Sequence, residues 1–127
     1  MNIQKEDKIK NLKGEYTFKQ STIISWDEIG LGAALYFRDS LVNEKILAKQ
    51  DFNGADIFLT TDSKLGLGQS GYILEILSNQ IIISASYEAG FKNGINKLIF
   101  LCFEGLDPKQ KKLYSVRLRC MELTHYD

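Results

Sequence analysis

One pair of neighbouring acidic residues could take part in acid–base chemistry. Asp27-Glu28 is the only Asp-Glu dipeptide in the chain, and paired carboxylates can act as general acid and general base, as they do in glycoside hydrolysis. Ser25 and Glu28, however, have the S-x-x-E spacing of a capping box, in which hydroxyl and carboxylate each bind a free backbone N–H at a helix start. The helix dipole also favours acidic residues there. We therefore predict that this segment caps a helix beginning near Trp26 and is not catalytic.

Three residues could bind a metal ion or take part in nucleophilic catalysis: Cys102, Cys120 and His125. Their spacing matches no zinc-site pattern and a fourth ligand is missing, so we predict no metal site. A Cys or Ser nucleophile needs a base, and we expect the only histidine to lie beside solvent in the C-terminal tail, where a base is poorly held. Both cysteines stand between hydrophobic neighbours, which predicts buried free thiols rather than a disulfide framework.

The glycine-rich segment Gly66–Gly71 has a composition that phosphate-binding loops share. It precedes a predicted strand rather than a helix, and it lacks the Lys and Thr of a P-loop. We therefore predict a loop that connects strands, and we assign no cofactor and no cofactor-binding residue.

Two groups of residues could form binding surfaces. A run of basic residues near the C-terminus is either a solvated loop and strand face or a docking surface for an acidic partner. Some aromatic side chains could stack on sugar rings if exposed, although we expect most of them in the core or at its rim. The basic residues are Lys109, Lys111, Lys112, Arg117 and Arg119, and the aromatic ones are Trp26, Tyr36, Tyr72 and Tyr87.

The first half of the chain predicts strands on either side of one helix. Alternating residues after Gly14 indicate one or two short strands that end near Ser25. Apolar residues then recur at spacings of three and four, which predicts an amphipathic helix from about Trp26 to Leu47. β-branched and aromatic residues predict a strand over Ala55–Thr61.

The second half predicts a hairpin, a helix and a strand. Tyr72–Leu77 and Gln80–Ala85 are separated by two residues, which predicts a β-hairpin whose second strand is central in the sheet. Ser86 is placed to cap a second helix that Gly105 and Pro108 would stop. Alternation over Leu113–Met121 predicts a last strand.

This order of elements predicts the fold class. Strands in runs and two separated helices indicate an α+β fold, with a largely antiparallel sheet and both helices packed on one face.

Length, composition and charge limit the possible classes of protein. The 127 residues are 44% hydrophobic, as in a single soluble globular domain. Sixteen basic and sixteen acidic residues give a net charge of zero, so we expect no nucleic-acid partner. No apolar run approaches the roughly 20 residues of a membrane span. The N-terminus does not resemble a secretory signal, so we expect a cytoplasmic protein unless a signal was removed from a secreted parent.

Three segments carry a resemblance to a known family. Gly71–Ile76 and Ile81–Ser86 are an apolar hairpin, and Ala89–Leu98 has the pattern A-G-x-x-x-G-x-x-x-L. Together they resemble the N-terminal accessory domain of family 20 β-N-acetylhexosaminidases, over roughly residues 14 to 103. Gly90 and Gly94 lie four apart, so their missing side chains would let the helix approach the sheet closely, which offsets the cost of glycine in a helix.

The resemblance implies a support role rather than catalysis. In those enzymes the domain leans against a barrel that holds the catalytic Asp-Glu pair, where a glutamate acts on the glycosidic oxygen and the acetamido group of the substrate attacks. Asp27-Glu28 lacks the context of that pair, and the substrate-binding arginine of the first barrel strand cannot be placed in Leu113–Asp127. No catalytic, cofactor-binding or metal-binding residue of the family carries over.

These observations lead to one organisation and one expected function. We expect a polar leader (residues 1–13), an accessory domain (14–106) and a C-terminal strand or linker (107–127) toward a catalytic barrel. The chain itself is expected not to be catalytic, and it is either an N-terminal fragment of a β-N-acetylhexosaminidase-like glycoside hydrolase or a stand-alone relative of that accessory domain. A parent protein would be a glycoside hydrolase acting on N-acetylhexosaminides. Its partner would be that barrel or a second copy of the chain, with carbohydrate reached through the parent. The alternative is a stand-alone module that binds carbohydrate or protein through the helix-free sheet face.

Overall fold

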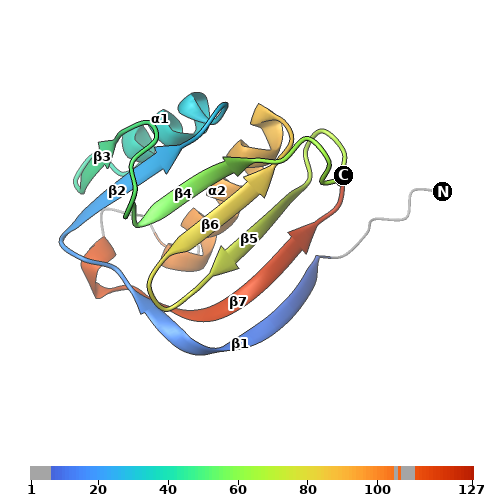
Figure 1. Cartoon of the computed structure of the whole chain (residues 1–127). Coiled ribbons are helices and arrows are strands. Elements are labelled where there is room, and N and C mark those ends of the chain that lie inside the picture. Colours follow the sequence, from blue (N-terminus) through green and yellow to red (C-terminus); the bar gives the residue numbers. More distant parts are fainter. Residues whose placement is uncertain (1–6, 105, 107–110) are drawn as a thin grey trace.

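The structure is a computed structural model, and it describes residues 7–104, 106 and 111–127. Seven strands form one sheet in the order β1-β7-β5-β6-β4-β2-β3 (Figure 1). The strands are β1 (Lys8–Thr17), β2 (Ser21–Trp26), β3 (Lys45–Ala48), β4 (Ile57–Thr61), β5 (Tyr72–Ile76), β6 (Ile81–Ala85) and β7 (Arg117–His125). The helices are α1 (Leu31–Ser40) and α2 (Glu88–Phe103), and a 3-10 turn covers Leu113–Ser115.

The sheet is mixed and mostly antiparallel, which confirms the predicted α+β class. The pairs β1–β7, β7–β5 and β5–β6 are antiparallel, and their ladders join more residues than the parallel pairs β6–β4, β4–β2 and β2–β3. The predicted hairpin is confirmed as β5 and β6, and β6 is the middle strand of the sheet. Its two neighbours run in opposite senses, so β6 is the boundary between the two halves.

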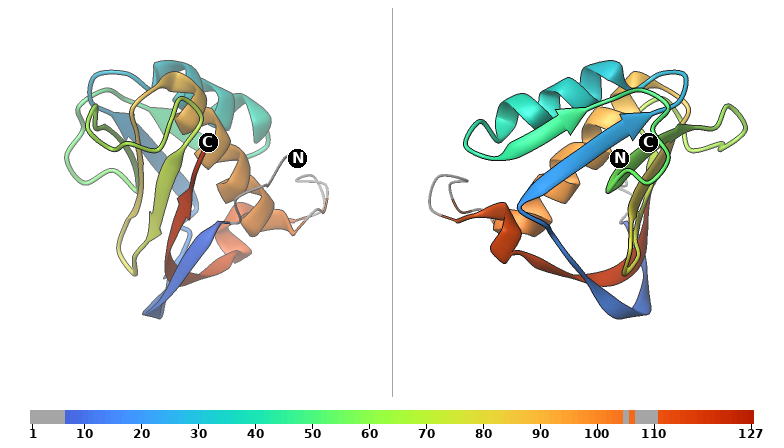
Figure 2. Two further views of the ribbon diagram at one scale, coloured as in Figure 1. Left: turned by 90° about the vertical axis from the view of Figure 1, so that its right-hand side faces the viewer. Right: turned by 60° about the vertical axis from the view of Figure 1, so that its left-hand side comes forward.

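Both helices cover one face of the sheet, as predicted (Figure 2). α1 packs on β2 and β3, α2 packs on β5, β6 and β7, and the helices contact each other. The close approach predicted for α2 is confirmed. A Cβ atom at Gly94 would lie 2.7 Å from Cγ2 of Ile83, and one at Gly90 would collide with the carbonyl oxygen of Gly71. The two glycines therefore let the helix backbone sit directly on the sheet.

The predicted start and end of the first helix are wrong. Ser25 lies in β2, where it is fully buried and its hydroxyl accepts a hydrogen bond from the N–H of Phe52 at 2.9 Å. The helix begins five residues after the predicted position, and Gly30, with φ of 122°, precedes it. It ends at Ser40, because Lys45–Ala48 forms the edge strand β3 beside β2. Pairing with β2 thus overrides the helical spacing of the apolar residues.

The boundaries of the second helix and of the last strand also differ from prediction. Ser86 does not cap α2; its hydroxyl donates to the carbonyl of Asp62 at 2.6 Å, and Tyr87 is the N-cap residue. Glu104, in the left-handed conformation, ends the helix. The predicted stop residues Gly105 and Pro108 lie outside the described residues. The last strand starts at Arg117 and continues to His125, since its partners β1 and β5 extend that far.

The sheet extends into both segments expected to flank the domain. β1 begins at Lys8, within the segment expected to be a polar leader, and pairs along β7. β7 in turn lies between β1 and β5 rather than at the edge. The expected division into residues 1–13, 14–106 and 107–127 stays a prediction.

Candidate functional site

The carboxylate of Asp27 joins the ends of two parallel strands. It accepts hydrogen bonds from the N–H of Thr61 at 3.0 Å, from the hydroxyls of Thr61 and Thr60 at 2.8 and 3.1 Å, and from the N–H of Glu28 at 2.6 Å. Burial by itself would raise the pKa of Asp27, but these hydrogen bonds outweigh burial and lower it. Asp27 is therefore held as an ion that ties β2 to β4, and it does not cap a helix.

The sequence contains one signal for this contact. Asp27 directly follows β2, and the Thr60-Thr61 pair ends β4. Parallel strands bring such ends together at one edge of a sheet. Glu28 is exposed beside Asp27. The carboxylate of Asp27 is taken up by hydrogen bonds from Glu28 and from the end of β4, so it serves as a link within the fold.

Glu88, at the start of α2, caps α1. Its carboxylate oxygens accept hydrogen bonds from the N–H of Gly30 at 3.2 Å and of Ala33 at 2.8 Å. Gly32 leaves room for it, because a Cβ atom there would lie 2.9 Å from Oε1. The anion-binding end of α1 is thus filled by a side chain of this protein.

His125 is not the solvated tail residue that we predicted. It is the last residue of β7, it stacks on Tyr72 with ring centroids 5.1 Å apart, and its Nδ1 lies 2.7 Å from a carboxylate oxygen of Asp7. Lys97 of α2 lies 3.6 Å from the other oxygen of Asp7. The imidazole is therefore well held between Tyr72 of β5 and Asp7, the residue before β1, and Asp7 is in turn paired with α2 through Lys97.

The cysteines and two of the aromatic residues lie where we predicted. Cys102 and Cys120 are buried free thiols, and burial raises the pKa of Cys102 to about 12, which makes its thiolate inaccessible near neutral pH. Trp26 and Tyr72 belong to the core. Within the described part of the chain, no three His, Cys, Asp or Glu side chains come together in a group that could hold a metal ion.

The other residues considered as binding groups are at least partly accessible wherever the structure describes them. Tyr36 is half-buried, and Tyr87 is 52% exposed. Of the basic run, Arg117 and Arg119 are exposed on β7. Lys111 and Lys112 follow the undescribed segment 107–110, which includes Lys109. The structure thus leaves a basic docking surface as a hypothesis.

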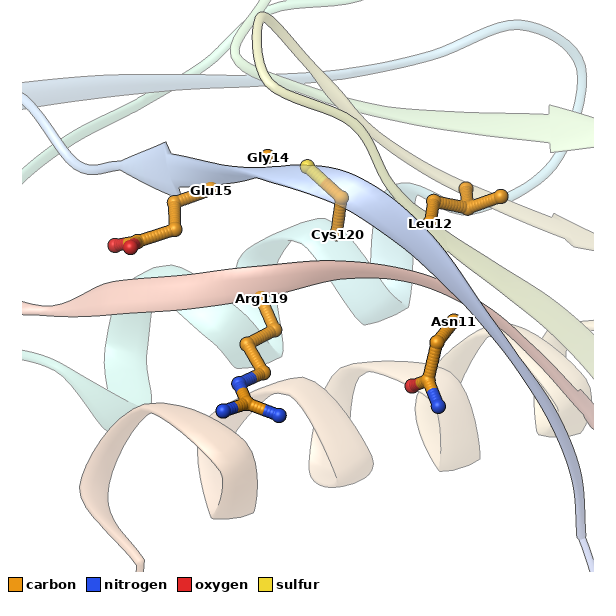
Figure 3. A pocket seen from close by; sticks show the side chains of 6 residues that line it. All are labelled: Asn11, Leu12, Gly14, Glu15, Arg119 and Cys120. Atoms are coloured by element: carbon orange, nitrogen blue, oxygen red, sulfur yellow. The ribbon is translucent and has the colours of Figure 1, made fainter.

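A hollow of about 340 Å³ lies where β1 bulges away from β7 (Figure 3). The register of the two strands shifts between Asn11 and Glu15. Of the six residues that line the hollow, Glu15 alone carries a carboxylate, and Arg119 is its partner across the strands. This hollow is therefore a surface feature whose one carboxylate is paired with an arginine across the strands, and its lining does not bring two carboxylates together. Its lining is Asn11, Leu12, Gly14, Glu15, Arg119 and Cys120.

The helix-free side of the sheet carries a half-buried surface, which we call the open sheet face. Phe58, Ile82, Glu75 and Glu122 are successive cross-strand partners on it, and Ile73 is next to them. Burial, and then the charge of Glu122, raise the pKa of Glu75. The face thus combines apolar side chains with two opposed carboxylates.

The two described helices can be compared with a membrane-spanning helix in length and composition. Neither helix in residues 7–104, 106 and 111–127 has the length and apolar character that a membrane span requires.

Comparison with known proteins finds similarity in solved structures alone. No protein-family model matches the sequence. No curated protein matches it either. Solved structures of several β-N-acetylhexosaminidases do match.

The matched enzymes contain this fold as one part. The Bacteroides fragilis β-N-acetylhexosaminidase aligns with a TM-score of 0.71 and 21% identity, over 93% of this chain and 23% of that one. The family 20 enzyme of Streptomyces coelicolor aligns with a TM-score of 0.78 and 17% identity, over 94% and 25%. A Streptomyces plicatus β-hexosaminidase aligns with a TM-score of 0.79 and 16% identity, over 94% and 24%.

The chain spans about a quarter of the length of these enzymes. At these identities the similarity is one of fold. Over almost its whole length, the chain has the fold of a domain-sized segment of the family 20 β-N-acetylhexosaminidases, and the resemblance noted in the sequence is confirmed at that level.

Proposed function

We propose that this chain is a non-catalytic accessory domain of a β-N-acetylhexosaminidase-like glycoside hydrolase and that it supports a catalytic barrel by packing against it. The observation that carries the proposal is the fold match, which covers 93% or more of this chain but only about a quarter of each enzyme. The remaining length of those enzymes leaves room for a barrel of roughly 250 residues.

The arrangement of acidic side chains supports a non-catalytic role. Asp27 is occupied by hydrogen bonds from β4, and Glu88 is occupied by the start of α1. A glycosidase positions a protonated acid beside a second carboxylate or the acetamido group of its substrate. The acids described above instead hold elements of the fold together.

Exposed apolar side chains offer surface for packing. Leu31 of α1 and Phe100 of α2 are 50% and 58% exposed, and Val42, just after α1, is 74% exposed. Single exposed apolar residues are common on protein surfaces, but side chains of this size would gain from burial against a second domain.

Turnover of a chromogenic N-acetylhexosaminide by the purified chain tests the non-catalytic part. We expect no hydrolysis above the buffer rate, and the Glu28→Gln variant serves as the matched control. Turnover that Glu28→Gln abolishes would show that the chain is an enzyme and would overturn the proposal.

The gene sequence around the chain tests the accessory part. An open reading frame that continues for roughly 300 residues, the length of a barrel with insertions, would support the proposal. Stop codons directly at both ends would contradict it.

The second candidate function is a binding module that uses the open sheet face. It is favoured by Phe58, Ile73 and Ile82, which are apolar, half-buried and adjacent on that face. The partner would be protein, carbohydrate or a second copy of the chain. Light scattering at high concentration tests the second copy: a dimer that Ile82→Lys dissociates would support it, and a strict monomer would contradict it.

A further inference from the structure

The loop between β4 and β5 holds the last residue of the chain. The carboxylate of Asp127 accepts hydrogen bonds from the hydroxyl of Ser70 at 2.7 Å and from the N–H groups of Gln69 and Ser70 at 3.1 and 3.5 Å. The N–H of Asp127 in turn donates to the carbonyl of Leu67 at 3.0 Å. Figure 1 shows the C-terminus beside this loop. Fifty-seven residues of sequence separate Ser70 from its partner.

The loop has the backbone geometry that such a contact needs. Gly66 and Gly68 have φ values of 71° and 83°, which residues with a side chain rarely adopt. A Cβ atom at Gly68 would collide with the side chain of Asp127. The amide of Asn93 on α2 donates to the carbonyl of Ser70 at 3.1 Å, so the loop is also tied to the helix layer.

Convergent backbone N–H groups in a turn form a concave site for an anion, known as a nest. We propose that Leu67–Ser70 is a carboxylate-binding nest whose occupant is the Asp127 side chain, and that this contact fastens the end of β7 to the β4–β5 loop. The ligand class is a carboxylate held by two amides and one hydroxyl. The proposal goes beyond the accessory role and does not depend on it.

The hydrogen bonds of the nest have an electrostatic consequence for Asp127. The Ser70 hydroxyl, followed by the Ser70 amide, lowers the pKa of Asp127, as expected for donors that favour the charged form. His125 lies close enough to add to this effect. The glycine-rich loop therefore does bind an anion, as its composition suggested, but that anion is the Asp127 carboxylate of the same chain.

Hydrogen exchange of individual amides, measured by NMR on the purified chain, tests the proposal. Asp127→Ala should accelerate exchange at the Gln69 and Ser70 amides about two- to fivefold, the range expected for an exposed charge interaction. Ser70→Ala keeps the Gln69 amide donor and should give a smaller change at Gln69. Asp62→Ala is the matched control, because Asp62 is an exposed acid of the same loop that accepts from the Lys64 amide instead.

Added acetate tests whether the nest recognises a carboxylate that is not tethered. Acetate should shift the Gln69 and Ser70 amide signals of Asp127→Ala and leave those of the native chain unchanged, because the native nest is filled. Unchanged exchange in Asp127→Ala, an equal change in Asp62→Ala, or no acetate shift in Asp127→Ala would each overturn the proposal. Fluorescence of the buried Trp26 checks that each variant is folded, and none of these outcomes bears on the turnover assay.

Discussion

The contact between α2 and the sheet gives the most specific prediction. Gly90 faces the backbone of Gly71, whereas Gly94 faces the side chain of Ile83. Replacing either glycine by alanine gains about 1 kcal/mol of helix propensity. The added methyl group must then fit against different kinds of atom, so the two variants should behave differently.

The cost of the methyl group is larger at Gly90. Overpacking a core costs about 1–3 kcal/mol, and Gly90→Ala should reach the upper end because a carbonyl oxygen of the backbone cannot rotate away. We expect a net loss of about 2 kcal/mol after subtracting the propensity gain of about 1 kcal/mol. At Gly94 the added Cβ would lie 2.7 Å from a methyl group of Ile83. That side chain can shift partly out of the way, so we expect the free energy of unfolding to fall by only about 1 kcal/mol.

Urea unfolding measures both effects, because Trp26 is the only tryptophan and is buried in the native state. Lys92→Arg, on the exposed side of the same helix, is the control: it keeps a cation over the Tyr36 ring and should change the free energy of unfolding by less than about 0.5 kcal/mol. Gly90→Ala that is as stable as the native chain would refute the argument that close backbone approach requires this glycine. The reverse order of the two variants would refute the distinction between backbone and side-chain neighbours.

Three further predictions concern charged side chains. Glu88→Ala should lower the free energy of unfolding by about 1 kcal/mol, as loss of a helix cap does, and Glu88→Gln by less; urea unfolding checks both. The pKa of Glu75 is raised, so its ionisation weakens the folded state, and stability should fall as pH rises through and above its ordinary value of 4.5. Glu75→Gln should remove that fall and stabilise the chain at pH 7 by about 0.2–1 kcal/mol, measured by thermal unfolding against pH. The pKa of Asp27 is lowered, so its contribution should be lost as pH falls below 3.8, and Asp27→Asn should flatten the acid limb of the same profile.

The features that the sequence predicted correctly have local causes. The hairpin of β5 and β6 follows from two apolar runs with a two-residue connection, and the central place of β6 follows from apolar residues on both of its faces. The role of Gly90 and Gly94 follows from their spacing of four on one helix, and the buried cysteines follow from their apolar neighbours. Each signal lies within about ten residues of the feature that it predicts.

The errors arose where a distant strand outweighed a local signal. Ser25 and Glu28 have the spacing of a capping box, but the backbone around Ser25 is paired with β4, so the helix starts later. The apolar residues after Leu41 continue a helical spacing, but a place beside β2 makes Lys45–Ala48 a strand. A capping box offers two hydrogen bonds, whereas a strand position offers a ladder of hydrogen bonds and burial in the core as well.

Local patterns of residues are sufficient to predict the α+β class, the hairpin, the helix that packs through glycines and the resemblance to a hexosaminidase domain. Which distant groups meet depends on the assembled fold: Asp27 with Thr61, Glu88 with the start of α1, His125 with Asp7, and Asp127 with Ser70. These partners are between 34 and 118 residues apart in the sequence. Periodicity and capping patterns describe neighbours within a few turns of the chain, so contacts of this kind arise only when the sheet is assembled.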